Sequence, residues 1–404
     1  MQMRWFGILV LAATCACSAL PGQTGFVHTK GTELVDGTGQ PLMLRGTNLG
    51  NWLEPEGYMF HFGDGAQSPS EIDRFSQELI GPENADAFWK AWRDNYITEK
   101  DLDRIAAMGF NSVRVPISWK FFDNDSAEGF RLLDRLVQWA KKDHLYVIID
   151  LHCAPGGQTG TNIDDSEGYP WLYLDAAAQT KTIAIWRRIA DHYHDDPTVL
   201  GYDLLNEPIP HFPALQRFNP DLDPLYKRIG AAVREVDKNH VLILGGAQWD
   251  SNFKVFGKPW DANVMYTFHK YWSATDVSVI RDYLEFRDKW QVPIWLGESG
   301  ENKDEWIAAF VKTLEENHVG WCFWPYKKMD AGSSVVTFDR PAGWDPIIAL
   351  SKMPSGTANA EKRIAARPSP ETVQGAFDDL LKKIAFENER LNPAYIAALG
   401  RKSP

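Results

Sequence analysis

The stretch Tyr146–His152 reads YVIIDLH and indicates how the chain folds. Its first six residues are almost all apolar, and a histidine follows directly where the apolar run stops. A short run without alternation between apolar and polar residues is typical of a strand that is buried on both faces of a parallel sheet. The residue that ends such a run then stands at the carboxyl edge of the sheet.

Similar apolar runs recur along the chain, and segments with helical periodicity separate them. One such segment is Phe130–Lys142, whose apolar residues fall on one face of a helix. Strands that alternate with helices over about 280 residues favour a (β/α)8 TIM barrel, which is an α/β fold. A doubly wound open sheet is the alternative, but no glycine-rich phosphate loop follows the first run. The eight runs are Leu42–Leu49, Ser112–Ile117, Tyr146–Leu151, Val199–Leu205, Val241–Leu244, Val264–Phe268, Pro293–Leu296 and Gly320–Trp324.

The segments that flank the barrel pattern have a different character. Residues 31–40 contain an Asp-Gly turn and predict an N-terminal β-hairpin that plugs the barrel bottom. Met353–Pro370 is rich in Pro, Ser, Ala and Arg and predicts a linker, and Glu371–Asn388 has helical periodicity. We therefore expect a catalytic barrel over residues 23–352 and a C-terminal helical extension over residues 353–404, either packed on the barrel or appended to it.

The first residues predict export. Residues 1–19 combine Arg4, a short apolar run and small residues at its end, which is typical of a secretory signal peptide. The run is too short for a permanent membrane helix, so no integral membrane segment is expected in the mature chain. We expect a secreted or periplasmic protein. A lipoprotein acylated at Cys15 or Cys17 is the alternative, but the residues that precede them fit a lipobox poorly.

Composition excludes several classes of protein. The chain has 404 residues, 24% of them charged and 44% hydrophobic, which argues against wholesale disorder and against a polytopic membrane protein. A net charge of −12 disfavours nucleic acid as a partner. Cys153 and Cys322 would remain after signal removal, and we expect both to be thiols. His152 and His269 lie on separate runs and form no His-x-His or His-Glu-x-x-His pattern, so we expect no metal and no cofactor.

Polar and aromatic residues stand where the apolar runs stop. Glu207 ends the fourth run and Glu298 ends the seventh. Because the carboxyl ends of barrel strands meet at one mouth, the two carboxylates could face each other at about 5–5.5 Å, the separation of a retaining glycosidase. A nucleophilic carboxylate needs donors around it, which Arg114 and Tyr271 could supply. The remaining residues of this kind are His152, Asn206, His269 and Trp324.

These residues carry a resemblance to a known family. The segment Leu204–Pro208 reads LLNEP and resembles the acid/base signature of glycoside hydrolase family 5, the cellulase family of retaining β-glycosidases. The resemblance spans about residues 30–330 and implies that Glu207 is the acid/base and Glu298 the nucleophile. It further implies that substrate is bound by Arg114, His152, Asn206, His269, Tyr271 and Trp324.

A finer resemblance points to one branch of the family. Arg45–Pro55 reads RGTNLGNWLEP and is similar to the opening of the exo-β-1,3-glucanase branch, although Asn51 replaces a usual glycine. His152–Gly160 is similar to a loop of the same branch. The resemblance implies that Glu54 reaches hydroxyls of a terminal sugar. It implies hydrolysis of a β-linked oligo- or polysaccharide, and we expect a monomer. An endo-β-1,4-glucanase, a mannanase, a transglycosylase and a non-catalytic carbohydrate-binding barrel are the alternatives.

The aromatic content fits a sugar ligand. The chain has 17 Trp, 13 Tyr and 21 Phe, and aromatic rings cover the flat C–H faces of sugars. The long loops expected at Leu53–Ile97 and Ala154–Ala176 would wall the mouth and favour a pocket over an open groove. We expect some of the rings beside strand ends to line subsites: Trp52, Tyr58, Phe60, Trp119, Tyr169, Trp171, Trp249, Trp260, Trp272, Trp324 and Tyr326.

Overall fold

The computed structural model describes residues 25–403 except residues 64, 124–126, 162 and 167. The predicted signal peptide, residues 1–19, lies outside the described residues, as do Cys15 and Cys17. Within the described part of the chain, no helix is both long enough and apolar enough to cross a membrane. Cys153 and Cys322 are buried free thiols, as expected.

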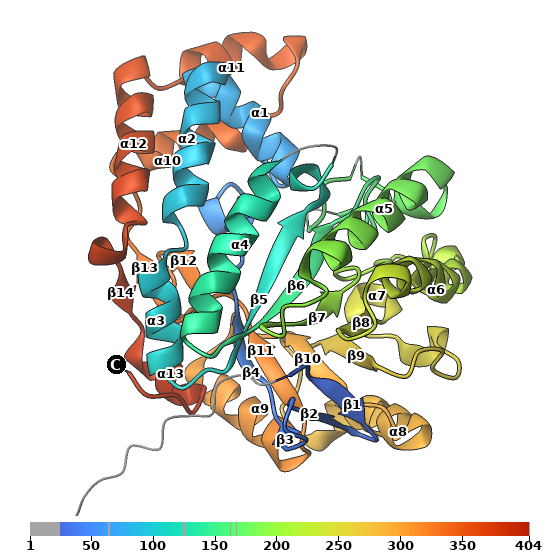
Figure 1. The fold of residues 1–404 in the computed structure, drawn as a ribbon. Coiled ribbons are helices and arrows are strands. Elements are labelled where there is room, and N and C mark those ends of the chain that lie inside the picture. Colours follow the sequence, from blue (N-terminus) through green and yellow to red (C-terminus); the bar gives the residue numbers. More distant parts are fainter. Residues whose placement is uncertain (1–24, 64, 124–126, 162, 167, 404) are drawn as a thin grey trace, which may run out of the picture.

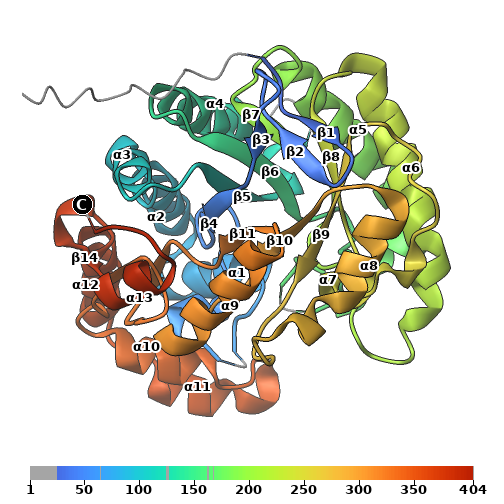
Figure 2. The ribbon, with the colours of Figure 1, turned by 90° about the horizontal axis from the view of Figure 1, so that it is seen from below.

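Eight parallel strands close into a barrel, which confirms the predicted fold (Figures 1 and 2). The strands follow one another around the barrel in chain order, and the last pairs with the first. They are buried almost throughout because helices cover their outer side and side chains fill the barrel interior. The strands are β4 (Arg45–Asn48), β5 (Ser112–Ser118), β6 (Tyr146–Cys153), β7 (Val199–Asp203), β8 (Val241–Gly245), β9 (Val264–His269), β10 (Ile294–Glu298) and β11 (Gly320–Phe323).

Amphipathic helices surround the barrel. In α4 (Ala127–Lys142) five apolar side chains are buried on one face, as the periodicity of that segment predicts. The helix α10 (Trp344–Ser351) follows the last barrel strand. The other helices around the strands are α3 (Glu99–Ala107), α5 (Ala176–Tyr193), α6 (Asn219–Val236), α8 (Arg281–Trp290) and α9 (Asp304–Glu316). The segment α7 (Ala247–Asp250), after β8, is a single turn in which Gln248 and Trp249 have left-handed backbone angles.

A small antiparallel sheet covers the bottom of the barrel, where a hairpin was expected (Figure 2). It consists of β1 (His28–Lys30), β2 (Glu33–Val35) and β3 (Pro41–Leu42). The first residues of the predicted run Leu42–Leu49 therefore belong partly to this sheet, and the barrel strand begins only at Arg45. Leu34 and Leu42 pack into one apolar cluster with side chains from the lower ends of the barrel strands.

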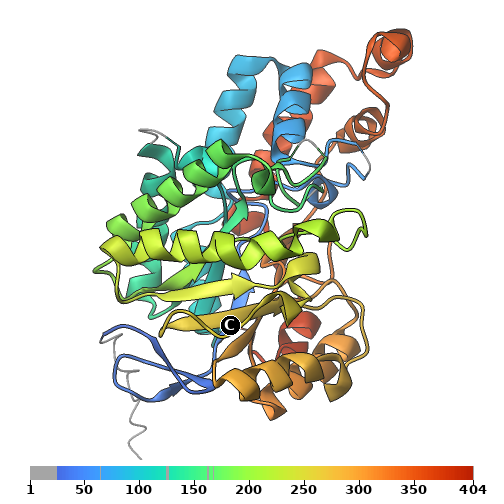
Figure 3. The ribbon, with the colours of Figure 1, turned by 90° about the vertical axis from the view of Figure 1, so that its right-hand side faces the viewer.

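The prediction of a long loop at Leu53–Ile97 is wrong, because two helices occupy most of this segment. They are α1 (Pro69–Ile80) and α2 (Pro82–Asn95), which rise beside the mouth of the barrel (Figures 1 and 3). Ser68 and Glu71 form a capping box that starts α1, and Gly81 separates the two helices. The Ser-x-x-Glu spacing was a readable signal for the first helix. The other expected wall, Ala154–Ala176, is largely irregular.

The C-terminal extension packs on the barrel. The helix α12 (Pro370–Lys383) contacts α1, α2 and α10, as Figure 3 shows. A second small sheet, β12 (Lys327–Met329), β13 (Val336–Phe338) and β14 (Arg390–Leu391), joins the end of the chain to the segment after β11. Lys327 is fully buried and pairs with Asp101 at 3.4 Å and with Glu389. The extension also includes α11 (Ala360–Ala366), within the predicted linker, and α13 (Pro393–Ala398).

Candidate active site

A cavity of about 540 Å³ opens at the carboxyl ends of the barrel strands. It lies where a (β/α)8 barrel carries its chemistry. Seven of the nine predicted site residues line this cavity: His152, Asn206, Glu207, His269, Tyr271, Glu298 and Trp324. Arg114 and Glu54 are fully buried and are not part of the lining.

Two glutamates face each other across this cavity. Glu298 is the last residue of β10, and Glu207 follows β7 by a few residues. One carboxylate oxygen of each and one ring nitrogen of His269 all lie within 4.8 Å of one another. The structure therefore brings together the two carboxylates that the sequence places at the ends of separate strands.

Glu298 is held as a carboxylate by donors on both oxygens. Arg114 Nη1 donates to Glu298 Oε1 at 2.5 Å, and the hydroxyl of Tyr271 donates to Oε2 at 3.0 Å. A guanidinium and a phenolic O–H both stabilise the charged form of the carboxyl group. Both carboxylate oxygens of Glu298 are thus engaged by donors, and the residue is only 5% exposed.

Arg114 is the centre of a buried network beneath the cavity. Its Nε donates to Asp203 Oδ2 at 2.9 Å, and its Nη2 lies 3.0 Å from Asp150 Oδ1. The same Nη2 donates to Asn206 Oδ1 at 2.9 Å. Because the guanidinium plane is rigid, these partners fix the one N–H group that meets Glu298. Burial, together with the charges of Asp150 and Glu298, raises the pKa of Asp203 to about 7 against the opposing effect of Arg114.

Glu207 has an environment of the opposite kind. Its Oε1 lies 2.9 Å from His269 Nδ1, and no lysine or arginine among the described residues forms an ion pair with it. Burial raises the pKa of Glu207 to about 7 and lowers the pKa of His269 to about 3. Glu207 therefore holds its proton near neutral pH while the imidazole beside it is uncharged.

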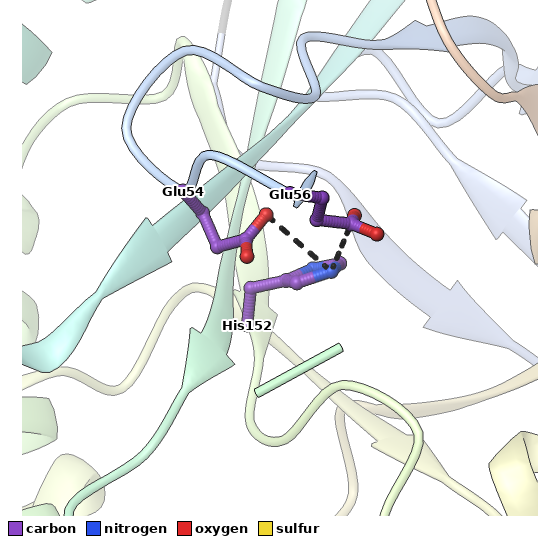
Figure 4. A group of neighbouring side chains, drawn as sticks. All are labelled: Glu54, Glu56 and His152. Atoms are coloured by element: carbon purple, nitrogen blue, oxygen red, sulfur yellow. Dashed lines mark ion pairs between the residues drawn. The ribbon is translucent and has the colours of Figure 1, made fainter. Parts of the chain in front are cut away.

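The predicted sugar contact Glu54 lies behind the cavity, and a residue that the sequence analysis missed lines it instead. Glu54 and Glu56 lie on the loop after β4 and approach the same edge of the His152 ring, which comes from β6 (Figure 4). His152 Nε2 is 3.9 Å from Glu54 Oε2 and 3.7 Å from Glu56 Oε1. Glu56 is part of the cavity lining. Burial is the main cause that raises the pKa of Glu56 to about 6.

The backbone explains why Glu56 points to the cavity. Asn51, which replaces the expected glycine, has a left-handed backbone with φ of 65°. Its side-chain oxygen accepts a hydrogen bond from the backbone N–H of Glu56 at 3.1 Å. Asparagine tolerates this conformation better than most residues. The departure from the family pattern is thus compatible with the turn and orients the following loop.

Trp324 forms one wall of the cavity in a fixed orientation. Its Nε1 donates to the hydroxyl of Tyr58 at 2.6 Å, and its ring stacks on His152 with centroids 5.6 Å apart and planes at 13°. Gly50 makes room for the ring, because a Cβ there would lie 2.1 Å from it. An indole face held in this way is suited to packing against a sugar.

The aromatic residues that the sequence analysis places beside strand ends divide into three groups. Tyr58, Trp249, Trp272 and Trp324 line the cavity. Trp272 is 71% exposed, while Tyr169 and Trp171 are exposed beside one another on the irregular loop after β6. Trp52, Phe60 and Tyr326 belong to the buried core instead, and the partly buried Trp119 and Trp260 pack against it. Position near a strand end was therefore a fair but incomplete guide to the rings around the mouth.

Two triads have the spacing of metal ligands, and their hydrogen bonds limit that role. Glu207, His269 and Glu298 form one, and the group in Figure 4 forms the other. Both oxygens of Glu298 already accept hydrogen bonds from Arg114 and Tyr271, and a nearby guanidinium repels a cation. Proton chemistry therefore suits the first triad better than metal binding does.

Comparison with known proteins identifies the family. Residues 68–330, more than half of the chain, match the family model described as cellulase (glycosyl hydrolase family 5). The chain belongs to glycoside hydrolase family 5 and is a glycosidase of the (β/α)8 class. This agrees with the family to which the strand-end residues show a resemblance.

Several curated proteins are similar over the barrel. A β-xylosidase of Phanerodontia chrysosporium is 30% identical over 61% of this chain and 52% of its own length, so the match spans about half of that relative. Endoglucanase C of Acetivibrio thermocellus is 26% identical over 60% of this chain and 88% of its own length. A glucan 1,3-β-glucosidase of Lachancea kluyveri is 26% identical over 66% of this chain and 65% of its own length.

Solved structures agree on the fold. An endogalactoceramidase superposes with a TM-score of 0.60 at 19% identity, covering 93% of this chain and 84% of that chain. Cel5A of Thermotoga maritima superposes with a TM-score of 0.52 at 21% identity, covering 72% of this chain and 92% of that chain. At these identities the likeness concerns the barrel architecture alone.

Proposed function

We propose that the protein is a retaining β-glycosidase in which Glu298 is the nucleophile and Glu207 the acid/base. The observation that carries this proposal is the pair of carboxylates with unequal environments on one cavity. Oxygens of the two groups approach within 4.8 Å. This is shorter than the separation of about 6.5–9.5 Å that leaves room for water between the carboxyl groups of an inverting enzyme.

The proposed reaction has two steps. In the first, an oxygen of Glu298 bonds to the anomeric carbon, the bond to the leaving oxygen breaks, and Glu207 gives that oxygen its proton. In the second, Glu207 takes a proton from water, the water oxygen bonds to the anomeric carbon, and Glu298 is released. Asn206, held by Arg114, is positioned to contact the sugar 2-hydroxyl, and Trp324 supports the sugar ring.

The substrate that we propose is a β-glucan attacked from its chain end, with β-1,3 linkages as the first choice. The similarity to a glucan 1,3-β-glucosidase supports the sugar and the linkage. Glu56 and Tyr58, on the loop after β4, support a blocked end of the cavity that would bind a terminal unit. The features of residues 1–19 support export to the medium or the periplasm. An endo-acting glucanase is the alternative, supported by the similarity to endoglucanase C.

Product analysis separates exo from endo action. We expect laminarin to release glucose from the first minutes, with no intermediate oligosaccharides, because a cavity that is blocked at one end accepts only a chain end. Cellulose and mannan serve as competing substrates, and aryl β-xylosides and β-glucosides compare the terminal sugar. A ladder of laminari-oligosaccharides at early times would contradict exo action while leaving the retaining chemistry intact.

The loop after β4 provides a matched pair of variants. We expect Glu56→Gln to lower kcat/KM on aryl glucosides by about 10–100-fold, because a charged hydrogen bond to a sugar hydroxyl contributes about 1.5–3 kcal/mol. Glu54→Gln, two residues away on the same loop, should cost clearly less, because its carboxyl group is fully buried behind the cavity. If Glu54→Gln lost more activity than Glu56→Gln at equal stability, Glu54 would be the sugar contact after all.

A further inference from the structure

An unusual turn, α7, follows β8 and borders the cavity through Trp249. Gln248, Trp249 and Asp250 all have left-handed backbones, with φ of 55°, 56° and 57°. Three successive non-glycine residues in this conformation are rare because each Cβ crowds the following carbonyl. Such strain persists only where the surroundings hold it, and it gathers at functional sites.

Side chains and the neighbouring loop hold this turn in place. The side-chain amides of Gln248 and Asn219 donate to each other at 2.8 and 3.1 Å. Asn252 Nδ2 donates to Gln248 Oε1 at 2.7 Å. The backbone N–H of Trp249 donates to Ile209 O at 3.2 Å, which ties the turn to the loop that carries Glu207.

The turn delivers the carboxyl group of Asp250 to the acid/base residue. Asp250 is fully buried, and its Oδ2 accepts a hydrogen bond from the backbone N–H of Glu207 at 3.1 Å. The same oxygen lies 3.3 Å from His269 Nε2, which has no hydrogen-bond partner among the described residues, and the other ring nitrogen of His269 contacts Glu207. A Cβ at Gly245 would lie 2.0 Å from Asp250 Oδ1, so glycine at that position makes room for the carboxyl group.

We propose that Asp250 is a positioning residue for Glu207, and that its Oδ2 joins the backbone of Glu207 to the imidazole of His269 and sets the tautomer of that ring. This inference rests on the proposed acid/base role of Glu207. Asp250 touches no reacting atom; it acts through His269 and through the peptide that precedes the Glu207 side chain.

The surroundings of Asp250 favour its neutral form. Its Oδ1 has no hydrogen-bond partner, and none of the described lysines or arginines forms an ion pair with it. Burial and the charges of Asp203 and Glu207 raise the pKa of Asp250 well above its usual value, against a smaller opposing effect of Arg114. A buried carboxylate without a cation is costly, whereas a neutral acid can donate and accept at one oxygen.

The neutral form defines the direction of the hydrogen bonds. In the proposed arrangement, an O–H at Asp250 Oδ2 supplies the donor that His269 Nε2, 3.3 Å away, otherwise lacks among the described residues. The imidazole then carries its proton on Nδ1 and donates it to Glu207 Oε1. The proton of Glu207 then sits on Oε2, the oxygen left free for the leaving group. After proton transfer, the same Nδ1–H stabilises the Glu207 carboxylate that must act as the base. One arrangement thus serves both steps.

The substitution Asp250→Asn tests this inference, because no single amide atom can both accept from Glu207 N–H and donate to His269 Nε2. We expect kcat/KM for a phenyl β-glucoside to fall by about 10-fold or more, since this leaving group needs the proton. For the 2,4-dinitrophenyl glucoside, which needs none, we expect kcat/KM to fall by less than about 3-fold.

The control is Asp237→Asn, at a second buried Asp–His pair. Asp237 Oδ2 lies 2.5 Å from His240 Nδ1, just before β8 and at the opposite end of that strand from the turn. The Asp237→Asn variant should leave the ratio of kcat/KM for the phenyl and the 2,4-dinitrophenyl glucosides at the wild-type value. Equal losses of Asp250→Asn on both substrates, or no loss on either, would overturn the proposal. If Glu207→Ala also lacked any leaving-group dependence, the proposed function itself would fail instead.

A second measurement does not depend on whether the Asp250→Asn variant folds. In wild-type enzyme with ¹⁵N-labelled histidine, the ring shifts of His269, assigned by their absence in His269→Gln, should show the Nδ1–H tautomer. The Nε2–H tautomer or an imidazolium at neutral pH would contradict the proposed direction of the hydrogen bonds.

Discussion

Replacing Glu298 with glutamine is expected to abolish turnover of every β-glycoside that the enzyme accepts. An amide oxygen does not form the covalent bond to the anomeric carbon, so kcat should fall by about 10⁴-fold or more, even on substrates with activated leaving groups. The loss should not depend on the leaving group, because the bond between Glu298 and the anomeric carbon must form before or while any leaving group departs.

The fold should tolerate this change. Arg114 keeps Asp150 and Asp203 as ion-pair partners, and the glutamine oxygen still accepts a hydrogen bond from the guanidinium or from Tyr271. Thermal unfolding of Glu298→Gln should therefore stay close to that of the wild type. Glu315→Gln, in a partly exposed pair with Arg45 at the far end of the barrel, is the matched control and should retain activity.

Covalent labelling gives an independent readout. A 2-deoxy-2-fluoro glucoside with a dinitrophenolate leaving group should add one sugar to the wild-type protein, on the peptide that contains Glu298. The glutamine variant should not be labelled. Near-wild-type turnover of the variant, or a label on another carboxylate, would remove Glu298 as the nucleophile.

The barrel and the main catalytic candidates were accessible from the sequence for one physical reason. Parallel strands buried on both faces leave near-continuous apolar runs, so the first polar residue after a run marks the carboxyl end of a strand. Glu298 ends β10 in this way, and His152 and His269 stand at or near the ends of β6 and β9. These positions could be predicted from the sequence because they lie on regular strands.

The side-chain positions of residues on irregular backbone could not be predicted in the same way. Glu54 and Glu56 lie two positions apart in a loop whose path depends on the left-handed Asn51, so spacing alone did not tell which carboxylate lines the cavity. Asp250 reaches Glu207 only through a left-handed turn that no propensity favours. Tertiary contacts decide these placements, and a single sequence does not display them.

The helices α1 and α2 are a different case, since their signals were present. The Ser68–Glu71 capping box and the prolines at the first helical positions mark both starts. From the sequence we expected a single helix after each strand, and we therefore overlooked the additional helices α1 and α2 between β4 and α3. These helices make the wall beside the mouth and provide the surface on which α12 packs.

Replacing Glu207 with alanine should separate the two steps of the reaction. Loss of the acid should lower kcat/KM for a phenyl β-glucoside by about 10²–10⁴-fold, whereas the 2,4-dinitrophenyl glucoside should still form the glycosyl-enzyme at a comparable rate. Without a base, hydrolysis of that intermediate becomes slow. We expect a burst of dinitrophenolate followed by a low steady rate.

Azide should restore the steady rate, because it attacks the intermediate without giving up a proton. The product should be the β-glycosyl azide, since two displacements keep the original configuration. Glu207→Gln is the matched variant: it keeps the size of the side chain beside His269, and the same dependence on the leaving group is expected. Equal losses on both substrates, or an α-azide, would refute the acid/base role of Glu207.

The pH profile should report the same group. Because burial raises the pKa of Glu207 to about 7, and because its protonated form is needed to expel a poor leaving group, wild-type kcat/KM for the phenyl glucoside should fall as the pH rises through about 7. In Glu207→Ala this descending limb should be missing for the same phenyl glucoside, because the group that loses its proton is gone. If the limb persisted unchanged in the variant, another group would control it, and the geometry of the His269 contact would then describe a structural carboxyl group rather than the catalytic acid.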